Sequence, residues 1–236
     1  MPTSSVFCAL DLPDLDGAVS LAAHVRDEVG GFKVGLELLA AHGPDAVRCV
    51  VALGSPVFLD FKFHDIPNTV AGAVRAASRF QVAMLTVHAA GGRAMIRAAV
   101  DAASEAAVRP KILAVTVLTS LKDGDLAEIG FAQGVADQAL RLADLAVRAG
   151  ADGVVCSPHE VGAMRARFGP EVQLVVPGIR PAGSTDPDDQ RRTLGPAEAL
   201  AEGADVLVVG RPITAAADPV AAARAIAAEL AATRPA

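Results

Sequence analysis

The stretch LDFKFHDIPNTV, from Leu59 to Val70, reads as a buried β-strand that runs directly into a helix. Within six positions it carries three residues that are charged at neutral pH, Asp60, Lys62 and Asp65, where the neighbouring segments carry Val and Ala. Burying a charge costs several kcal/mol unless partners and hydrogen bonds compensate for the lost water. These three charges therefore need either a structural or a chemical reason.

Strand-like runs of the same kind recur about eight times along the chain, and each is followed by an Ala-rich stretch with apolar residues at helical spacing. The runs are VFCALDL, GFKVGLE, PVFLDFKF, VAMLTVHAA, ILAVTVLT, GVVCSP, VQLVVPGI and DVLVVGRPI. Apolar strands that alternate with amphipathic helices indicate a parallel sheet covered on its outer face. The pattern predicts an α/β fold, a closed (β/α)8 TIM barrel that forms one domain over residues 1–236.

The composition is that of a barrel-sized domain with a core of small aliphatic residues. The chain is 52% hydrophobic with 3% aromatic residues and no Trp or Tyr. Charges interrupt every apolar run well before the roughly 20 residues that a membrane-spanning helix needs, and the N-terminus lacks the basic start of a secretory signal. We therefore expect a cytoplasmic protein that does not enter a membrane.

The net charge and the cysteine content limit which binding partners and metal sites are expected. A formal net charge of -6 without a basic run argues against nucleic acid. The three cysteines, Cys8, Cys49 and Cys156, are scattered, without a CxxC or a His at ligand spacing, so we expect reduced core thiols and no metal site. An anionic small molecule remains compatible with this charge, because a few basic residues focused in a cleft outweigh a diffuse surface charge.

Alternation along the strand predicts where the charges of the opening stretch point. Asp60 and Lys62 share one face of the strand, and Phe61 and Phe63 share the other. The two Phe side chains suit the helix-covered outside, which leaves the charged pair facing the barrel mouth. For an isolated Asp–Lys pair, the alternative is a structural salt bridge at the end of the strand, with no role in function.

Other predicted strands also end in polar residues, which favours a functional site over a structural salt bridge. The carboxyl ends of barrel strands meet at one rim, where barrel enzymes keep their active sites. The residues that converge there are Asp11, Lys33, Thr119 with Ser120, Arg180, and Gly210 with Arg211.

The signs of the charges suggest a chemical role for one lysine. Lys33, Asp60, Lys62 and Asp65 alternate in sign along the sequence, so each lysine can lie near a carboxylate. Flanking carboxylates favour the protonated form of a lysine. We therefore expect Lys62 to donate a proton rather than to attack as a nucleophile.

A phosphate site is expected at the far end of the chain. The segment VVGRPIT offers backbone N–H groups after Gly210 and the guanidinium fork of Arg211, which matches phosphate geometry. Arg180 opens a polar loop over residues 180–192, between the seventh and eighth strands, where barrels commonly bind phosphate. Gln190, late in this loop, is expected to reach back over the ligand.

The sequence resembles the orotidine 5'-phosphate decarboxylase family, in its short bacterial form, over essentially the whole chain. The resemblance rests on DFKFHDIPNTV for the family signature D-x-K-x-x-D-I-P-N-T, supported in order by ALDL, KVGLEL, VTVLTS, VPGIRP and VVGRPIT. It implies a homodimeric barrel that converts orotidine 5'-monophosphate to uridine 5'-monophosphate and CO2, the last step of de novo UMP synthesis, without a metal or an organic cofactor.

The resemblance also implies roles for single residues. Lys62 corresponds to the proton donor to C6, Asp60 to the carboxylate beside the leaving CO2 group, and Lys33 to a member of the same charge network that reaches the ribose. Residues that the family supplies from the partner subunit are Asp65 and Thr69, and Ile66 of the same signature is expected to contact substrate. The remaining substrate contacts are Asp11 for the ribose, Thr119 for the pyrimidine, and Arg180, Gln190, Gly210 and Arg211 for the phosphate.

Two other readings remain open from the sequence. A magnesium-dependent sugar-phosphate decarboxylase or aldolase on a related barrel shares D-x-K-x-x-D, but typically carries an acidic residue in place of Lys33 and lacks I-P-N-T. A non-catalytic phosphosugar-binding barrel is the other. The sequence does not decide between Thr119 and Ser120 for the base contact, and we assign no catalytic role to His64 or His88.

Overall fold

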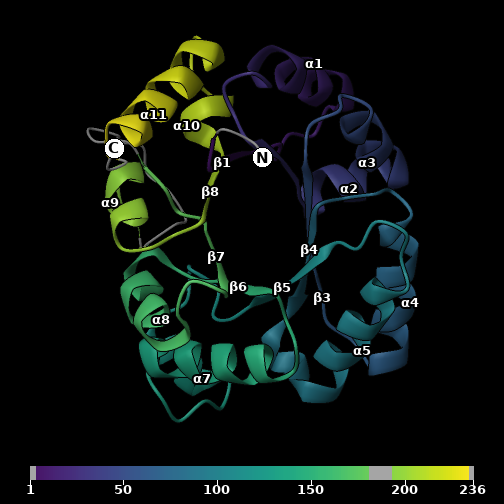
Figure 1. Ribbon diagram of the computed structural model, residues 1–236, viewed down its shortest axis with the longest axis vertical. Helices are drawn as coiled ribbons and strands as arrows, with labels where there is room; N and C mark the ends of the chain where they lie inside the picture. Colours follow the sequence, from purple (N-terminus) through teal and green to yellow (C-terminus); the bar gives the residue numbers. More distant parts are fainter. Residues whose placement is uncertain (1–3, 181–192, 234–236) are drawn as a thin grey trace.

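The computed structural model describes residues 4–180 and 193–233, and in these residues parallel strands close into a barrel (Figure 1). Each strand pairs with the next in sequence, and β1 pairs with β8 to close the ring. The strands are β1 (Val6–Ala9), β2 (Gly31–Val34), β3 (Val57–Phe63), β4 (Met84–His88), β5 (Lys111–Val115), β6 (Gly153–Val155), β7 (Gln173–Val176) and β8 (Val206–Val209). The predicted TIM barrel is confirmed.

Helices form a ring outside the strands (Figure 1). They are α1 (Leu15–Val25), α2 (Leu36–His42), α3 (Pro44–Val51), α4 (Pro67–Ser78), α5 (Gly92–Ser104), α6 (Asp123–Glu128), α7 (Val135–Arg148), α8 (Val161–Phe168), α9 (Pro196–Ala201), α10 (Arg211–Thr214) and α11 (Pro219–Thr233), with the 3₁₀ turns η1 (Ala89–Gly91) and η2 (Pro158–Glu160). None of the helices in the described residues is long and apolar enough to cross a membrane.

Two hydrophobic clusters follow from the alternation of side chains along the strands. The larger cluster lies between strands and helices, and the smaller one fills the barrel interior. On β3, Phe58 belongs to the interior cluster, whereas Leu59, Phe61 and Phe63 pack with the outer one. The prediction that Phe61 and Phe63 face outward is confirmed, and with it the inward direction of Asp60 and Lys62.

Glycines at positive φ connect several helices to the strands that follow. Gly150, Gly169 and Gly203 come after α7, α8 and α9 and have φ of 96°, 68° and 106°. Glycine adopts this left-handed region without steric cost, so the chain can turn sharply into the next strand.

The cysteines lie apart and are free. Cys8 and Cys156 are buried, but Cys49 on α3 is partly exposed, so only two of the three are core thiols.

Candidate active site

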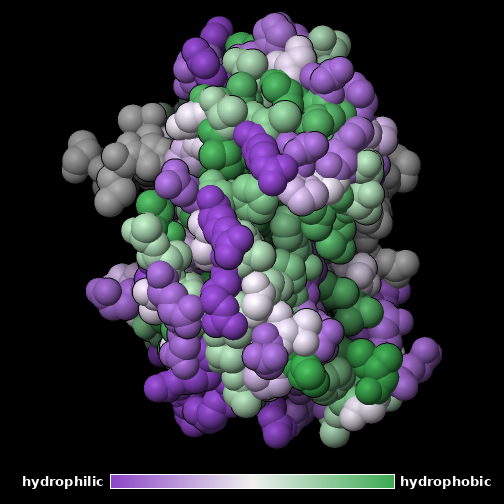
Figure 2. All heavy atoms as spheres, turned by 90° about the vertical axis from the view of Figure 1, so that its right-hand side faces the viewer, coloured by the Kyte–Doolittle hydropathy of each residue, from purple (hydrophilic) through white to green (hydrophobic). Residues whose placement is uncertain are grey.

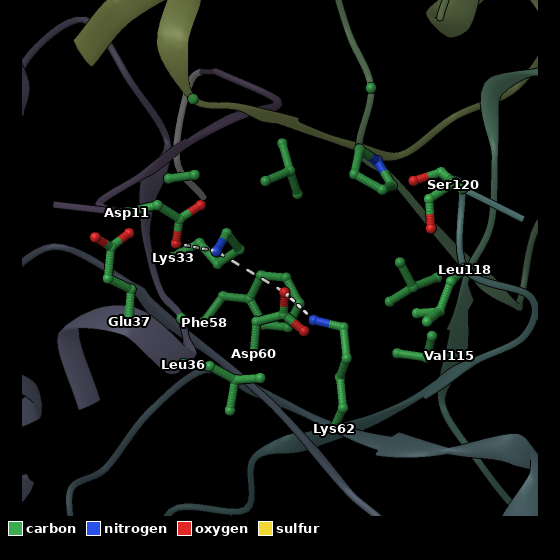
Figure 3. A pocket seen from close by; sticks show the side chains of 18 of the residues that line it. Asp11, Lys33, Leu36, Glu37, Phe58, Asp60, Lys62, Val115, Leu118 and Ser120 are labelled. Atoms are coloured by element: carbon green, nitrogen blue, oxygen red, sulfur yellow. Dashed lines mark hydrogen bonds and ion pairs between the residues drawn. The ribbon is translucent and has the colours of Figure 1, made fainter. Parts of the chain in front are cut away.

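A cavity of about 710 Å³ opens at the carboxyl ends of the strands. Its lining includes most of the residues that the sequence placed at this rim: Asp11, Lys33, Asp60, Lys62, Thr119, Ser120, Arg180, Gly210 and Arg211. It also includes residues that the sequence did not single out, among them Leu36, Glu37 and Phe58 (Figure 3). Residues far apart in the chain thus meet in one pocket because the barrel brings all strand ends to one rim.

Four charged side chains form a continuous row in this pocket, which we call the ion row: Asp11, Lys33, Asp60 and Lys62 (Figure 3). Lys33 Nζ lies 2.8 Å from Asp11 Oδ1 and 3.8 Å from Asp60 Oδ2. Lys62 Nζ donates to Asp60 Oδ2 at 2.8 Å. The charges alternate in sign along the row, so every ion has an opposite neighbour.

Burial differs along the ion row. The exposed fraction of the side chain is 9% for Lys33, 15% for Asp60, 30% for Lys62 and 48% for Asp11. The two central ions are held away from solvent, where charges interact more strongly than in bulk water. Lys62 lines the cavity and is the more exposed of the two lysines, so a ligand can reach its ammonium group.

Gly35 gives the Asp11–Lys33 pair the space that it needs. A Cβ at this position would lie 2.5 Å from Asp11 Oδ1 and 2.7 Å from Lys33 Nζ. Both distances are too short for a real contact, so a side chain at position 35 would displace one of the ions. The glycine of KVGLEL therefore has a role in the pocket that the sequence alone did not indicate.

The backbone of Lys62 is in an unusual conformation. Its φ is 51°, in the left-handed region that costs a residue with a side chain about 1–2 kcal/mol. The register between β3 and β4 shifts between Leu59 and Phe63, which marks a β-bulge. Bulges often re-aim side chains near active sites, and here the bulge carries the lysine of the ion row.

Two arginines lie at the β7 and β8 side of the same cavity. Arg180 follows β7, where its backbone N–H donates to Leu194 O at 3.0 Å and its Nη1 donates to Ile179 O at 2.8 Å. Arg211 begins α10 directly after Gly210. The two guanidinium groups give this end of the pocket positive charge. Gln190, which we expected beside them, lies outside the described residues.

The second half of the signature segment lies outside the cavity of this chain. Asp65, Ile66 and Thr69 are exposed and are not among the residues that line it. Asp65 Oδ1 accepts a hydrogen bond from the backbone N–H of Ile66 at 2.6 Å, and Ile66 is 67% exposed. Within one protomer, Asp11 rather than Asp65 is therefore the second carboxylate of the ion row.

A pair of histidines lies at the carboxyl ends of β3 and β4, with His64 directly after β3 and His88 as the last residue of β4. The rings of His64 and His88 stack with centroids 5.2 Å apart, and His88 Nδ1 accepts a hydrogen bond from the backbone N–H of Ala90. Burial lowers the pKa of His88 below its usual value, and the charges of His64 and Lys62 lower it further. The pair borders the bulge of Lys62 but is not part of the cavity lining.

Among the described residues, no group of three or more His, Cys, Asp or Glu side chains could hold a metal ion.

Comparisons with known proteins agree in pointing to one family. Residues 4–226 match the model of the Orotidine 5'-phosphate decarboxylase / HUMPS family. Proteins named orotidine 5'-phosphate decarboxylase from Paramagnetospirillum magneticum and Anaeromyxobacter sp. strain K are 54% and 56% identical over 230 and 229 residues. These matches cover 95% and 97% of this chain, and 97% and 99% of the two relatives.

Similarity to solved structures agrees with the family match. The orotidine 5'-phosphate decarboxylase of Lactobacillus acidophilus superposes with a TM-score of 0.82 at 40% identity, over 95% of this chain and 98% of that one. An uncharacterized conserved protein of Geobacillus kaustophilus superposes with a TM-score of 0.83 at 33% identity, over 95% of this chain and 99% of that one. From the family match and these relatives, the chain belongs to the Orotidine 5'-phosphate decarboxylase / HUMPS family.

Proposed function

We propose that this chain decarboxylates orotidine 5'-monophosphate to uridine 5'-monophosphate in the described cavity, with Lys62 as the proton donor. The observation that carries the assignment of residues is the ion row, which places an ammonium group between a carboxylate and an open cavity. Relatives at 54% and 56% identity carry the name of this enzyme, and the reaction is the last step of UMP synthesis.

The chemistry explains why charges are concentrated here. When the C6–carboxylate bond breaks, CO2 leaves and the electron pair stays in an sp2 orbital at C6 that cannot delocalise into the ring. A site can stabilise such localised charge only by fixed electrostatics. The Lys62 ammonium supplies positive charge where the pair develops and then transfers a proton to C6, while Asp60 lies beside the leaving carboxylate and destabilises it relative to the transition state.

The remaining lining residues suit the other parts of the nucleotide. Asp11 and Lys33 bond the ribose hydroxyls, Thr119 or Ser120 bonds the pyrimidine, and Arg180 with Gly210 and Arg211 holds the phosphate. The two arginines support this orientation because phosphate is bound well by guanidinium groups. Binding energy from the remote phosphate can then offset the cost of bringing a carboxylate beside Asp60. In this scheme no metal or organic cofactor takes part.

A homodimer completes the site in this proposal. Asp65, Ile66 and Thr69 lie outside their own cavity, and Ile66 is a large apolar side chain in open exposure, as expected for a segment that contacts another subunit. Figure 2 shows green hydrophobic surface between purple side chains on the side of the molecule that carries α3 and α4. We propose that this segment reaches the partner's cavity, where Asp65 continues the ion row and Thr69 contacts the substrate.

The magnesium-dependent alternative has no support in these observations. Its enzymes typically carry an acidic residue at the position of Lys33, whereas here the Lys33 ammonium bridges Asp11 and Asp60.

Turnover by the purified protein tests the function. Loss of orotidine 5'-monophosphate absorbance is followed with and without EDTA, and we expect equal rates, because no step needs a divalent ion. The absence of turnover would overturn the proposed function, and turnover abolished by EDTA would favour the magnesium-dependent alternative.

Two variants test the assignment of residues. Lys62→Ala removes the proton donor, so kcat should fall by at least about 10⁴-fold in a protein that still folds. Arg211→Ala removes a phosphate contact, so KM should rise by about 10- to 100-fold with a smaller change in kcat. Near-normal turnover of Lys62→Ala would rule out its role.

A further inference from the structure

Thr86 on β4 lies opposite the bulge that carries Lys62. Leu59 pairs with Leu85 and Phe63 pairs with Val87, so the three residues from Asp60 to Lys62 face Thr86 alone. A bulge of this kind leaves backbone groups without partners in the neighbouring strand. Buried backbone N–H groups need an acceptor, and at this point the regular ladder of β4 offers Lys62 none.

The hydroxyl of Thr86 supplies the missing acceptor. The backbone N–H of Lys62 donates to Thr86 Oγ1 at 2.8 Å. A hydroxyl accepts with its lone pairs and donates its one proton. That proton has two candidate acceptors, Asp60 Oδ1 at 3.1 Å and Leu59 O at 3.5 Å, and the shorter contact to the charged carboxylate is the stronger one.

The Asp60 carboxylate is consequently held at both oxygens. Oδ1 accepts from Thr86, while Oδ2 accepts from Lys62 Nζ at 2.8 Å and lies 3.8 Å from Lys33 Nζ. Thr86 itself is fully buried and is not part of the cavity lining, so a ligand in the cavity does not touch it. One hydroxyl therefore joins the backbone of Lys62 to the side chain of its ion-pair partner.

We propose that Thr86 is a positioning residue for the decarboxylation, which rests on the proposed function of Lys62 and Asp60. Its hydroxyl holds the Lys62 backbone in the left-handed conformation of the bulge and fixes the plane of the Asp60 carboxylate. Without it, the Lys62 N–H loses its partner and Asp60 turns about its remaining bond to Lys62. The ammonium group then no longer sits at the position where charge develops on C6.

The experiment compares Thr86→Val with a matched control, Thr116→Val. Val keeps the branched shape of Thr and replaces the hydroxyl with a methyl group. Thr116 on the loop after β5 is equally buried, but its hydroxyl donates to the backbone oxygen of Val155 and makes no contact with the ion row. We expect kcat of Thr86→Val to fall by about 10²-fold, because a small misplacement of reacting groups has an effect of that size, and kcat of Thr116→Val to stay near the wild-type value.

A second readout separates positioning from general damage. Both the KM for orotidine 5'-monophosphate and the dissociation constant for uridine 5'-monophosphate should change little in Thr86→Val, because ribose, base and phosphate contacts remain. Equal kcat values for Thr86→Val and Thr116→Val would overturn the proposal, and so would a parallel loss of nucleotide binding and kcat in Thr86→Val.

A second pair of variants decides the case if Thr86→Val does not fold. Thr86→Ser and Thr86→Ala differ by one oxygen atom, and we expect Ser to restore most of the activity that Ala loses. Equal activity in these two variants would show that the hydroxyl is dispensable. Wild-type turnover, measured in the same series, distinguishes this outcome from a failure of the proposed function, because an inactive wild-type protein would overturn the function and not only the role of Thr86.

Discussion

Lys33 is the most deeply buried charge of the ion row, and carboxylates on two sides hold its ammonium group. Such a group stays buried only because both partners and the cavity compensate for its lost hydration. The charges of the ion row also shift the pKa of a neighbouring residue that takes no part in the chemistry. This residue is Cys8 on β1.

Burial and, to a smaller extent, the charge of Asp11 raise the pKa of the Cys8 thiol to about 12, although the charge of Lys33 opposes them. The thiolate is the reactive form, so Cys8 should resist alkylation. We expect iodoacetamide at pH 8 to label Cys49, which is partly exposed, and to label Cys8 and Cys156 only after unfolding in urea. Mass spectrometry of the labelled peptides measures this, and labelling of folded Cys8 at the rate of Cys49 would contradict it.

Single residues also show how far the sequence could predict the site. Lys62, Asp60 and Lys33 were predicted because charges in apolar strands are conspicuous. Thr86 was not, because Thr is an ordinary strand residue in VAMLTVHAA, and its contact depends on a register shift that alternation does not reveal. Gly35 was missed for a related reason, since only the packed side chains show that a Cβ would strike Asp11 and Lys33.

At the scale of elements, the ends of β3 and β4 form one unit with the 3₁₀ turn η1. His88 ends β4 and caps η1 by accepting the backbone N–H of Ala90, and it stacks on His64 after β3. A protonated imidazole cannot accept this bond at Nδ1, and it would face His64 and the Lys62 ammonium. The cap therefore depends on a neutral His88.

This dependence predicts a loss of stability in acid. The pKa of folded His88 lies below its unfolded value of 6.5, so the folded state binds fewer protons in the window below pH 6.5. The contribution of His88 is complete above pH 6.5 and is lost as the pH falls through the folded pKa. His88→Asn keeps an acceptor for the cap and removes this titration, so its free energy of unfolding should fall less between pH 7 and pH 5 than that of the wild type. Urea unfolding at both pH values measures this, and equal losses in the two proteins would contradict it.

The order of the strands and the directions of their side chains were predictable at this scale. Period-two alternation and eight repeated units leave little freedom in a closed parallel barrel. The left-handed Lys62 was not predictable. Alternation continues unbroken through Phe61 and Phe63 on either side of it, so the bulge leaves no trace in the hydrophobic pattern.

At the scale of the whole molecule, the proposed shared site predicts recovery of activity by subunit exchange. Lys62→Ala and Asp65→Ala should each be inactive as homodimers. A mixed dimer would hold one intact site, with Lys62 from one subunit and Asp65 from the other. Random exchange makes about half of the dimers mixed, so turnover should return to about a quarter of the wild-type value.

The matched control for this exchange uses Lys62→Ala with Asp60→Ala. Both residues belong to the cavity of their own chain, so a mixed dimer of these two variants has no intact site. Recovery in the first mixture but not in the second supports the shared site. Absence of recovery after exchange has been verified by mass spectrometry would contradict it.

The start of β1 and the end of α11 have a practical consequence for how the protein can be immobilised. β1 starts at the rim opposite the cavity, and Arg224 of α11 binds Glu28 just ahead of β2, so the last helix also heads toward that opposite rim. Ser4 and Thr233 consequently lie away from the mouth through which a nucleotide enters. A surface tether attached at Ser4 or Thr233 should therefore leave that entrance open, and the immobilised catalyst should keep its turnover.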